Sequence, residues 1–170
     1  RTGPQRVGGW SRSSQLMEMP KLLELFSGTG SVGRAFDALG WDVVSVDLDP
    51  RAHATYQCDV AQWDCSCVGK IDVIWASPPC THYSKARSRG GVRDLEGSDG
   101  LVLKTLQIAE ALGNPRKFIE NLFTGELKNR GLLSHLDMQI VDYCIYGFPY
   151  RKRTSIWTNT GWQPARPLCK

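Results

Sequence analysis

The sequence predicts an α/β protein built on a mainly parallel sheet, and three observations lead to this fold class. Short apolar runs, each the length of a strand, alternate along the chain with stretches whose apolar residues recur at helical spacing. Several of these runs stop abruptly at glycine, proline or aspartate. Open parallel sheets bind ligands at the carboxyl ends of their strands, so these stopping points are the places where a site is expected.

The expected elements follow one another closely along the chain. Val32, Phe36 and Leu39 lie three or four residues apart, which is typical of a helix, and Gly40 is suited to end it. Pro50 is suited to open a second helix. Strands are expected at residues 21–26, 42–47, 71–76, 117–120, 139–144 and 154–158, and helices at residues 31–39, after Pro50, and at residues 101–112 and 132–136.

Two segments fall outside this alternation. Residues 1–18 are polar and rich in glycine, serine and arginine, so we expect a flexible lead-in, or residues foreign to the domain, which would span residues 19–170. Residues 81–98 are polar, basic and glycine-containing, and they predict a long mobile loop. A loop of this length inside a compact domain usually has a function.

The composition is that of an ordinary globular domain, with 41% hydrophobic and 22% charged residues. No apolar run approaches the roughly 18 residues of a membrane span, and the N-terminal stretch lacks the apolar core of a signal peptide. We therefore expect no membrane partner and an intracellular protein that is not secreted, cytoplasmic in a prokaryotic, phage or viral setting and nuclear in a eukaryote. Cys58, Cys65 and Cys67 lack the spacing typical of zinc ligands, so no metal is expected.

The net charge of +4 is unevenly distributed. Residues 41–80 hold six aspartates against two basic residues, whereas residues 81–170 hold fourteen basic residues against eight acidic ones. Such a split suits a protein with a basic face for a polyanion, although solvated charges on unrelated faces would give the same split.

The first apolar run ends in a turn with two glycines, which let the backbone approach a ligand closely. The residues of this turn are Phe26, Ser27, Gly28, Thr29 and Gly30. The next run ends in Asp47 and Leu48, and Asp59 and Val60 follow the strand expected after it. A carboxylate at such a strand end accepts hydrogen bonds from ribose hydroxyls. The ordered series of glycine turn and two acids therefore predicts a pocket for an adenosyl nucleoside, while the missing phosphate-binding lysine disfavours a nucleoside triphosphate.

A cysteine and a glutamate follow the next two strands. Pro78 and Pro79 fix the backbone after the run at residues 71–76 and present Cys80 at the ligand-binding side of the sheet. A lone cysteine is more often a buried structural residue, but the basic residues that follow this one favour a reactive thiolate. Glu120 ends the next strand, so a nucleophile and an acid are expected on adjacent strand ends.

Four motifs in this order carry a resemblance. They are Phe-Ser-Gly-Thr-Gly at residues 26–30, Ser-Pro-Pro-Cys at 77–80, Glu-Asn at 120–121 and Pro-Tyr-Arg-Lys-Arg at 149–153, where proline replaces a glutamine. Over about residues 20–160 the sequence resembles the DNA cytosine-5 methyltransferases. The resemblance implies a Rossmann-like class I methyltransferase fold, with a mostly parallel sheet, a reversed last strand and helices on both faces.

The resemblance also implies a reaction. S-Adenosylmethionine would methylate carbon 5 of a cytosine flipped out of duplex DNA, leaving S-adenosylhomocysteine. Cys80 would add to carbon 6, Glu120 would protonate or hydrogen-bond ring nitrogen 3, and Arg151 and Arg153 would hold the base carbonyl and the carboxylate or thiolate. The residues expected against the cofactor are Phe26, Ser27, Gly28, Thr29, Gly30, Asp47, Leu48, Asp59, Val60 and Pro78. The residues expected against DNA are Ser84, Lys85, Arg87, Arg89 and Arg93.

The sequence departs from the family after Arg153, where only 17 residues remain. This is too few for a target-recognition region and for the final segment that returns to the cofactor pocket, so we expect a missing segment or a partner subunit to supply them. Two alternatives stay open. One is an RNA cytosine-5 methyltransferase, because a transfer-RNA-modifying branch shares the motifs. The other is a non-catalytic binding module that has kept the fold.

Overall fold

A computed structural model describes residues 18–85 and 91–170 of the chain, so nearly all of the expected lead-in lies outside the described residues. The described part is built on a seven-stranded sheet with the strand order β3-β2-β1-β4-β5-β7-β6. Strands β1 to β5 pair in parallel, whereas β7 runs antiparallel to both of its neighbours. The predicted mostly parallel sheet with a reversed last strand is confirmed.

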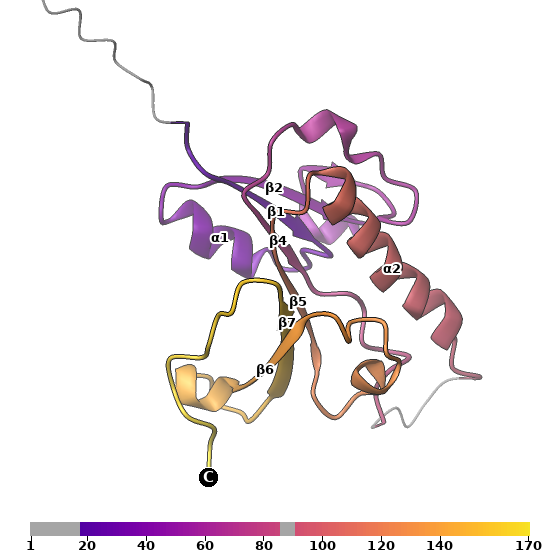
Figure 1. Cartoon of the computed structure of the whole chain (residues 1–170), viewed down its shortest axis with the longest axis vertical. Helices are drawn as coiled ribbons and strands as arrows, with labels where there is room; N and C mark the ends of the chain where they lie inside the picture. Colours follow the sequence, from indigo (N-terminus) through magenta and orange to yellow (C-terminus); the bar gives the residue numbers. More distant parts are fainter. Residues whose placement is uncertain (1–17, 86–90) are drawn as a thin grey trace, which may run out of the picture.

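The strands are β1 (Lys21–Leu25), β2 (Asp42–Asp47), β3 (Tyr56–Gln57), β4 (Val73–Ala76), β5 (Arg116–Leu122), β6 (Asp137–Asp142) and β7 (Arg153–Thr158). Two α-helices, α1 (Ser31–Asp37) and α2 (Leu95–Ala111), lie on opposite faces of the sheet (Figure 1). The shorter 3-10 helices are η1 (Pro50–Ala52), η2 (Cys65–Val68), η3 (Leu127–Asn129) and η4 (Tyr143–Tyr146). Within the described ranges, no helix is long and apolar enough to cross a membrane.

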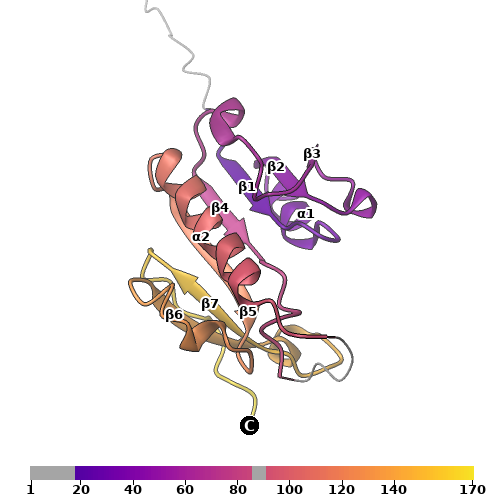
Figure 2. The same cartoon turned by 90° about the vertical axis from the view of Figure 1, so that its right-hand side faces the viewer.

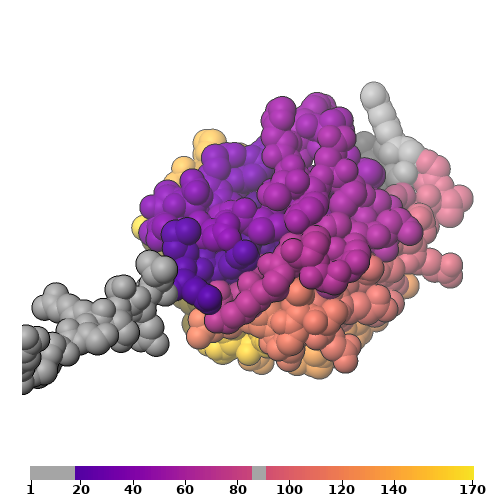
Figure 3. Space-filling view, turned by 90° about the horizontal axis from the view of Figure 1, so that it is seen from above, coloured from indigo at the N-terminus to yellow at the C-terminus, as the bar shows by residue number. Residues whose placement is uncertain are grey.

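The two faces of β1 explain the two helices, because successive side chains of a strand point to opposite sides. Leu23 and Leu25 pack into the main hydrophobic core with residues of α2. Figure 2 shows α2 lying along the sheet at β4 and β5. Glu24 points to the other face, where its Oε2 accepts a hydrogen bond from the Gly33 backbone N–H of α1 at 3.0 Å. A Cβ atom at Gly33 would lie 2.5 Å from that oxygen, so glycine lets α1 approach the sheet. In the space-filling view from above, the first half of the chain (indigo to magenta) lies directly against the second half (orange to yellow) (Figure 3).

Three predicted elements differ from the structure. The helix expected after Pro50 is only the three-residue η1, and residues 132–136 form turns rather than a helix. Since β6 already begins at Asp137, these five residues leave no room for a stable helix. Helix α2 begins at Leu95, six residues earlier than expected, because the Asp94 side chain caps it by accepting a hydrogen bond from the Gly97 backbone N–H at 2.8 Å.

The loop predicted at residues 81–98 therefore ends at Asp94, and its beginning is held in the core. Tyr83 is fully buried, and its hydroxyl donates a hydrogen bond to Asp99 Oδ1 of α2 at 2.7 Å. The other oxygen of Asp99 accepts from Arg130 Nε at 2.9 Å. Burial, together with the Asp99 carboxylate, raises the pKa of the Tyr83 phenol far above its usual value. The chain that follows Cys80 is thus fixed to α2.

Substitution Tyr83→Phe tests this anchor. It removes the hydroxyl donor and leaves the Asp99 oxygen with one partner fewer, so the free energy of unfolding should fall by about 1–3 kcal/mol. Urea denaturation followed by circular dichroism measures the change. The matched control is Tyr146→Phe, whose hydroxyl belongs to an exposed side chain and should matter by no more than about 0.5 kcal/mol. Equal stability of the two variants would show that Arg130 alone satisfies Asp99.

Candidate functional site

The carboxyl ends of β1, β2, β4 and β5 meet at one end of the sheet, because these strands run parallel and follow one another in space. This region is called the carboxyl end of the sheet below. It carries the glycine turn after β1, Asp47 at the end of β2, the Ser-Pro-Pro-Cys segment after β4 and Glu120 near the end of β5. The sequence motifs therefore converge as predicted.

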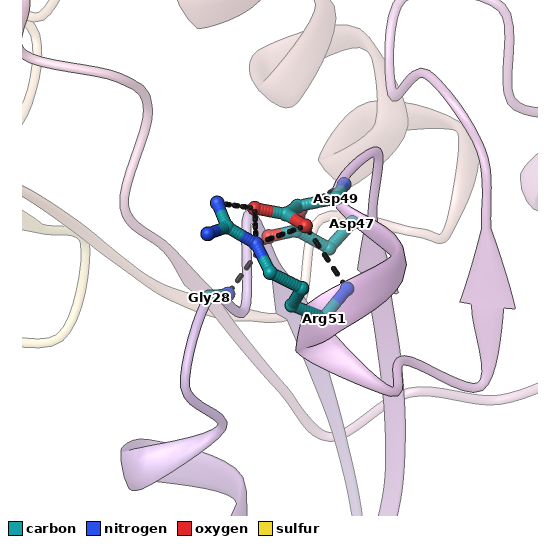
Figure 4. A network of polar contacts seen from close by, with 4 residues as sticks. All are labelled: Gly28, Asp47, Asp49 and Arg51. Atoms are coloured by element: carbon teal, nitrogen blue, oxygen red, sulfur yellow. Dashed lines mark hydrogen bonds and ion pairs between the residues drawn. The ribbon is translucent and has the colours of Figure 1, made fainter.

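The glycine turn is tied to the end of β2. Phe26 has a positive φ of 57°, and its backbone N–H donates to the Val46 carbonyl at 2.9 Å. The Gly28 backbone N–H donates to Asp47 Oδ2 at 2.7 Å, while Asp47 Oδ1 accepts from the Asp49 backbone N–H at 2.8 Å (Figure 4). One carboxylate thus fixes the turn, and each of its oxygens still has a lone pair for a further donor.

The second acidic position is less constrained. Asp59 lies two residues beyond β3, and its Oδ1 accepts a hydrogen bond from the Ala61 backbone N–H at 2.9 Å. The adjacent Val60 is buried in the core. Leu48, directly after Asp47, is 66% exposed at the carboxyl end of the sheet. Asp47 and Asp59 therefore lie at the ends of neighbouring strands, with an uncovered apolar side chain beside the first.

Cys80 is brought to β5 by a buried hydrogen bond. Asn121 is almost fully buried, and its Nδ2 donates to the Pro78 carbonyl at 3.0 Å. Pro78 is buried as well, whereas Cys80 is half-buried. The Ser84 backbone N–H donates to the Cys80 carbonyl at 2.9 Å, which closes a turn directly after the cysteine. The side-chain amide next to Glu120 thus holds the segment that carries the thiol.

Glu120 is paired with a lysine. Lys152 Nζ lies 3.0 Å from Glu120 Oε1, and the Tyr143 hydroxyl donates to the same oxygen at 3.4 Å. The ammonium also lies 4.9 Å from the centre of the Tyr143 ring. Burial alone would lower the pKa of Lys152, but the charge of Glu120, with smaller contributions from Tyr143 and Cys80, outweighs it and raises the pKa.

The two arginines of the same motif occupy a different place from the one expected. Arg153 forms two hydrogen bonds to Asp142, at 2.9 and 2.7 Å, and Arg151 lies 3.9 Å from the same carboxylate. The alternation of side chains along a strand gives the reason. Ile156 of β7 lies opposite Glu120 of β5, and Lys152 is four residues before Ile156, so it falls on the same face as Glu120. The carboxylate that the two arginines contact is Asp142, and the cation on Glu120 is Lys152. The expected contacts of Arg151 and Arg153 with the base carbonyl or the thiolate stay predictions.

The residues expected against nucleic acid are only partly described. Lys85 Nζ forms an ion pair with Glu126 Oε1 at 3.1 Å, and Ser84 belongs to the turn after Cys80. Arg93 is exposed one residue before the cap of α2. The other two, Arg87 and Arg89, lie outside the described residues. The described members follow Cys80 or precede α2, on the same side of the sheet as the cysteine.

Comparison with known proteins identifies the family. A family model described as C-5 cytosine-specific DNA methylase matches residues 20–122, which is more than half of the chain. A probable DNA (cytosine-5)-methyltransferase of Frog virus 3 (isolate Goorha) is 40% identical over 155 residues, covering 82% of this chain and 70% of that protein. The chain belongs to the C-5 cytosine-specific DNA methylase family. The resemblance drawn from the four motifs is confirmed.

More distant similarities place this methylase among larger proteins. Type II methyltransferase M.MspI of Moraxella sp is 27% identical over 127 residues, which cover 69% of this chain and 28% of that protein. The crystal structure of the S. pombe Dnmt2 methyltransferase matches with a TM-score of 0.58 at 18% identity, over 85% of this chain and 53% of that one. Magnesium protoporphyrin IX methyltransferase from Synechocystis, solved with bound SAM, matches with a TM-score of 0.54 at 15% identity. This match covers 84% of this chain and 72% of that one. These structures confirm the Rossmann-like class I methyltransferase fold.

The site fits S-adenosylmethionine, the methyl donor of the family. Ser27 Oγ is buried in the glycine turn and lacks a hydrogen-bond partner among the described atoms, so it has capacity for a polar group of a ligand. Leu48 offers apolar surface nearby, and Asp47 offers hydrogen-bond acceptors. These three features meet the needs of a nucleoside with a ribose and an aromatic base.

Sequence reasoning missed three residues of the candidate site. Lys152 lies between two arginines and was not distinguished from them. The alternation of side chains, continued back from the strand expected at residues 154–158, would have placed Lys152 on the opposite face from both arginines. Tyr143 and Asp142 gave no signal of this kind, because their partners lie 23 and 11 residues away in the sequence. In the described chain, no cluster of three or more histidine, cysteine or acidic side chains is arranged to hold a metal ion.

The Asp142–Arg153 pair predicts a pH dependence of stability. The hydrogen bonds from Arg153 hold the pKa of Asp142 at about 2, below its ordinary value near 3.8. Because the pKa is lowered on folding, the pair stabilises the fold at pH values above about 4 and loses this effect as the pH falls toward 2. Asp142→Asn should therefore be destabilised relative to the natural chain at pH 6, with the difference shrinking between pH 4 and 2.

Urea denaturation over this pH series measures the difference. Asp137→Asn is the matched control, because Asp137 is an exposed aspartate of the same strand and its substitution should change the unfolding free energy little. A gap between Asp142→Asn and the natural chain that is as wide at pH 2 as at pH 6 would contradict the ion-pair interpretation.

Proposed function

We propose that this chain transfers a methyl group from S-adenosylmethionine to carbon 5 of cytosine in DNA, through a covalent adduct of Cys80 at carbon 6 of a base flipped out of the duplex. The observation that carries the proposal is the meeting of Cys80 and Glu120 on neighbouring strand ends, joined by the Asn121–Pro78 hydrogen bond. Membership of the cytosine-5 methylase family supports the reaction type. The frog virus relative, a probable DNA (cytosine-5)-methyltransferase, supports DNA as the substrate.

The side chains have distinct proposed roles. Cys80 Sγ attacks carbon 6 of the cytosine, and the electron pair of the carbon 5–carbon 6 double bond then makes carbon 5 nucleophilic. For this step Glu120 is in its protonated form, and its carboxyl proton is donated to ring nitrogen 3, outright or in a hydrogen bond, which makes the ring a better electrophile. Lys152 and Tyr143 contact only Oε1, so Oε2 is the oxygen proposed to carry this proton. When bound, S-adenosylmethionine supplies an electrophilic methyl group for carbon 5. Loss of the carbon 5 proton to a base re-forms the double bond and expels the Cys80 thiolate.

Lys152 takes the part that the resemblance gave to arginine. Its ammonium holds the Glu120 carboxylate by a charge-assisted hydrogen bond of 3.0 Å. Lys152 therefore orients the proposed acid. Arg151 and Arg153 support the site indirectly by fixing Asp142 beside it.

The remaining parts of the proposal concern binding. Phe26, Ser27, Gly28, Thr29 and Gly30, with Asp47, Leu48, Asp59, Val60 and Pro78, would hold the cofactor. Ser84, Lys85 and Arg93, with Arg87 and Arg89 of the undescribed segment, would contact the phosphates of DNA. A further segment or a partner subunit would supply target recognition, because the chain spans 28% of the M.MspI type II enzyme that it resembles.

Cofactor binding is tested at Asp47. Asp47→Ala frees the Gly28 N–H and removes an acceptor for ribose, so the affinity for S-adenosylhomocysteine should fall by roughly 1–3 kcal/mol. Isothermal titration calorimetry measures it. Asp49→Ala is the matched control, since it removes the exposed ion pair with Arg51 and the cap of the short helix η1 but no contact with the glycine turn, and it should leave the cofactor affinity nearly unchanged. Unchanged affinity of Asp47→Ala would place the cofactor elsewhere.

The covalent step is tested by trapping. Fluorine at carbon 5 cannot leave as a proton, so DNA containing 5-fluorocytosine should remain bound to the protein in the presence of cofactor. Cys80→Ser should abolish the adduct in denaturing electrophoresis, because a hydroxyl is a much poorer nucleophile than a thiolate. Cys144→Ser is the matched control and should still be trapped.

The acid and its lysine are tested in the same assay. Glu120→Gln and Lys152→Met should slow trapping by roughly 100-fold, the usual size of a lost proton-transfer contribution. Lys152→Arg should trap faster than Lys152→Met, because it keeps the charge. An adduct that persists in Cys80→Ser would mean that another thiol attacks, and no adduct at all would favour a non-catalytic binding module.

A further inference from the structure

An exposed group of aromatic rings lies beside the site and has no role in the reaction proposed above. Tyr146 is 41%, Phe148 47% and Tyr150 55% exposed. Every other aromatic side chain within residues 18–85 and 91–170 is buried or half-buried. Exposed apolar patches on soluble proteins mark interaction sites. These three residues are called the aromatic surface below.

The aromatic surface is continuous with the catalytic acid. The Phe148 ring lies 5.1 Å from the Tyr143 ring and 5.9 Å from the Tyr150 ring, centre to centre. Tyr143 is the residue whose hydroxyl donates to Glu120. The backbone folds Phe148 back onto this ring, because the Phe148 N–H donates to the Tyr143 carbonyl at 3.3 Å and Gly147 between them has a φ of 95°. A series of rings therefore leads from Glu120 out to solvent.

The surroundings of the aromatic surface carry more cations than carboxylates. Residues 143–170 contain five lysines and arginines and not one aspartate or glutamate, and Asp142 and Glu120 form ion pairs with three of the five. Arg166 lies over the Tyr146 ring, 5.4 Å from its centre, and donates a hydrogen bond to the Ile145 carbonyl. The C-terminal tail therefore passes the short helix η4, which contains both residues (Figure 1). Arg151, next to Tyr150, has a half-exposed side chain. A polyanion would be attracted to this region.

Exposed rings among cations fit unpaired nucleobases better than other ligands. Bases stack on aromatic side chains in single-stranded nucleic acid, while lysine and arginine follow the phosphates. In a closed duplex the faces of the bases are covered by their neighbours, so these rings would find no stacking partner. An apolar protein segment would not account for the lack of any carboxylate over residues 143–170.

We propose that the aromatic surface stacks on unpaired bases next to the target cytosine, so that the protein binds single-stranded or locally opened DNA more tightly than closed duplex. This inference rests on the proposed function for the identity of the target, and it adds the state in which the strand is presented. Tyr150 supplies an exposed ring, Tyr146 supplies the part of its ring that Arg166 does not cover, and Arg151 and Arg166 contact the backbone phosphates.

The experiment compares oligodeoxynucleotides of one sequence in single-stranded and duplex form, with S-adenosylhomocysteine present. Fluorescence anisotropy gives the affinity, and 2-aminopurine placed beside the target cytosine reports stacking through quenching. Tyr150→Leu and Tyr146→Leu keep apolar bulk but remove the ring, and each should weaken single-strand binding by about tenfold. Tyr150→Trp should retain affinity and quenching. Leu39→Ala, at an exposed leucine after α1, is the control with unchanged binding.

The outcomes separate this inference from the proposed function. Weaker binding and lost quenching in the leucine variants, with tighter binding of single strand than of duplex by the natural chain, would support the stacking surface. The same result from a chain that fails to trap 5-fluorocytosine would refute the reaction and leave the stacking surface supported. Leucine variants that bind every oligonucleotide like the natural chain would overturn the inference, even if trapping succeeds.

Discussion

The hydrogen bond from Asn121 to the Pro78 carbonyl is the constraint on which the rest of the site depends. Parallel pairing of β4 and β5 brings the two strand ends to the same level, but it does not decide where the chain goes after β4. Pro78 and Pro79 have no backbone N–H with which to form a regular hydrogen-bonded turn. The buried Asn121 amide of the next strand holds this segment instead, by donating a hydrogen bond to the Pro78 carbonyl. Because Glu120 precedes this amide directly, one short stretch of β5 positions both Cys80, the proposed nucleophile, and Glu120, the proposed acid.

A second constraint is the alternation of side chains along the chain that enters β7. It distributes three consecutive cations over two places, with Lys152 on Glu120 and the two arginines on Asp142. The lysine meets the buried Glu120 carboxylate and the Tyr143 ring at the carboxyl end of the sheet. The Asp142 pair also receives the Cys169 backbone N–H at 3.0 Å, so it attaches the C-terminal tail to β6. One short basic motif thus contacts both the proposed acid, Glu120, and the carboxylate that holds the C-terminal tail, Asp142.

Much of this could be predicted from the sequence, because the strand ends carry local signals. Glycines, prolines and acids that interrupt apolar runs marked Asp47, Cys80 and Glu120, and the parallel fold brought them together. Long-range partners left no such trace. Tyr83 in a polar loop gave no hint of burial against α2, and the glycines at the start of α2 concealed a helix that begins at an aspartate cap. The identity of the cation on Glu120 required the pairing of β7 with β5.

The central claim is that these side chains direct a methyl group to carbon 5 of cytosine in DNA. The most direct measurement offers duplex DNA and transfer RNA in parallel, with S-adenosylmethionine carrying a deuterated methyl group, to the protein together with any further segment of its reading frame. Mass spectrometry of the digested nucleosides then locates the label. The account predicts labelled 5-methyldeoxycytidine from DNA. Label on an exocyclic amine of cytosine or adenine, or label confined to transfer RNA, would contradict it.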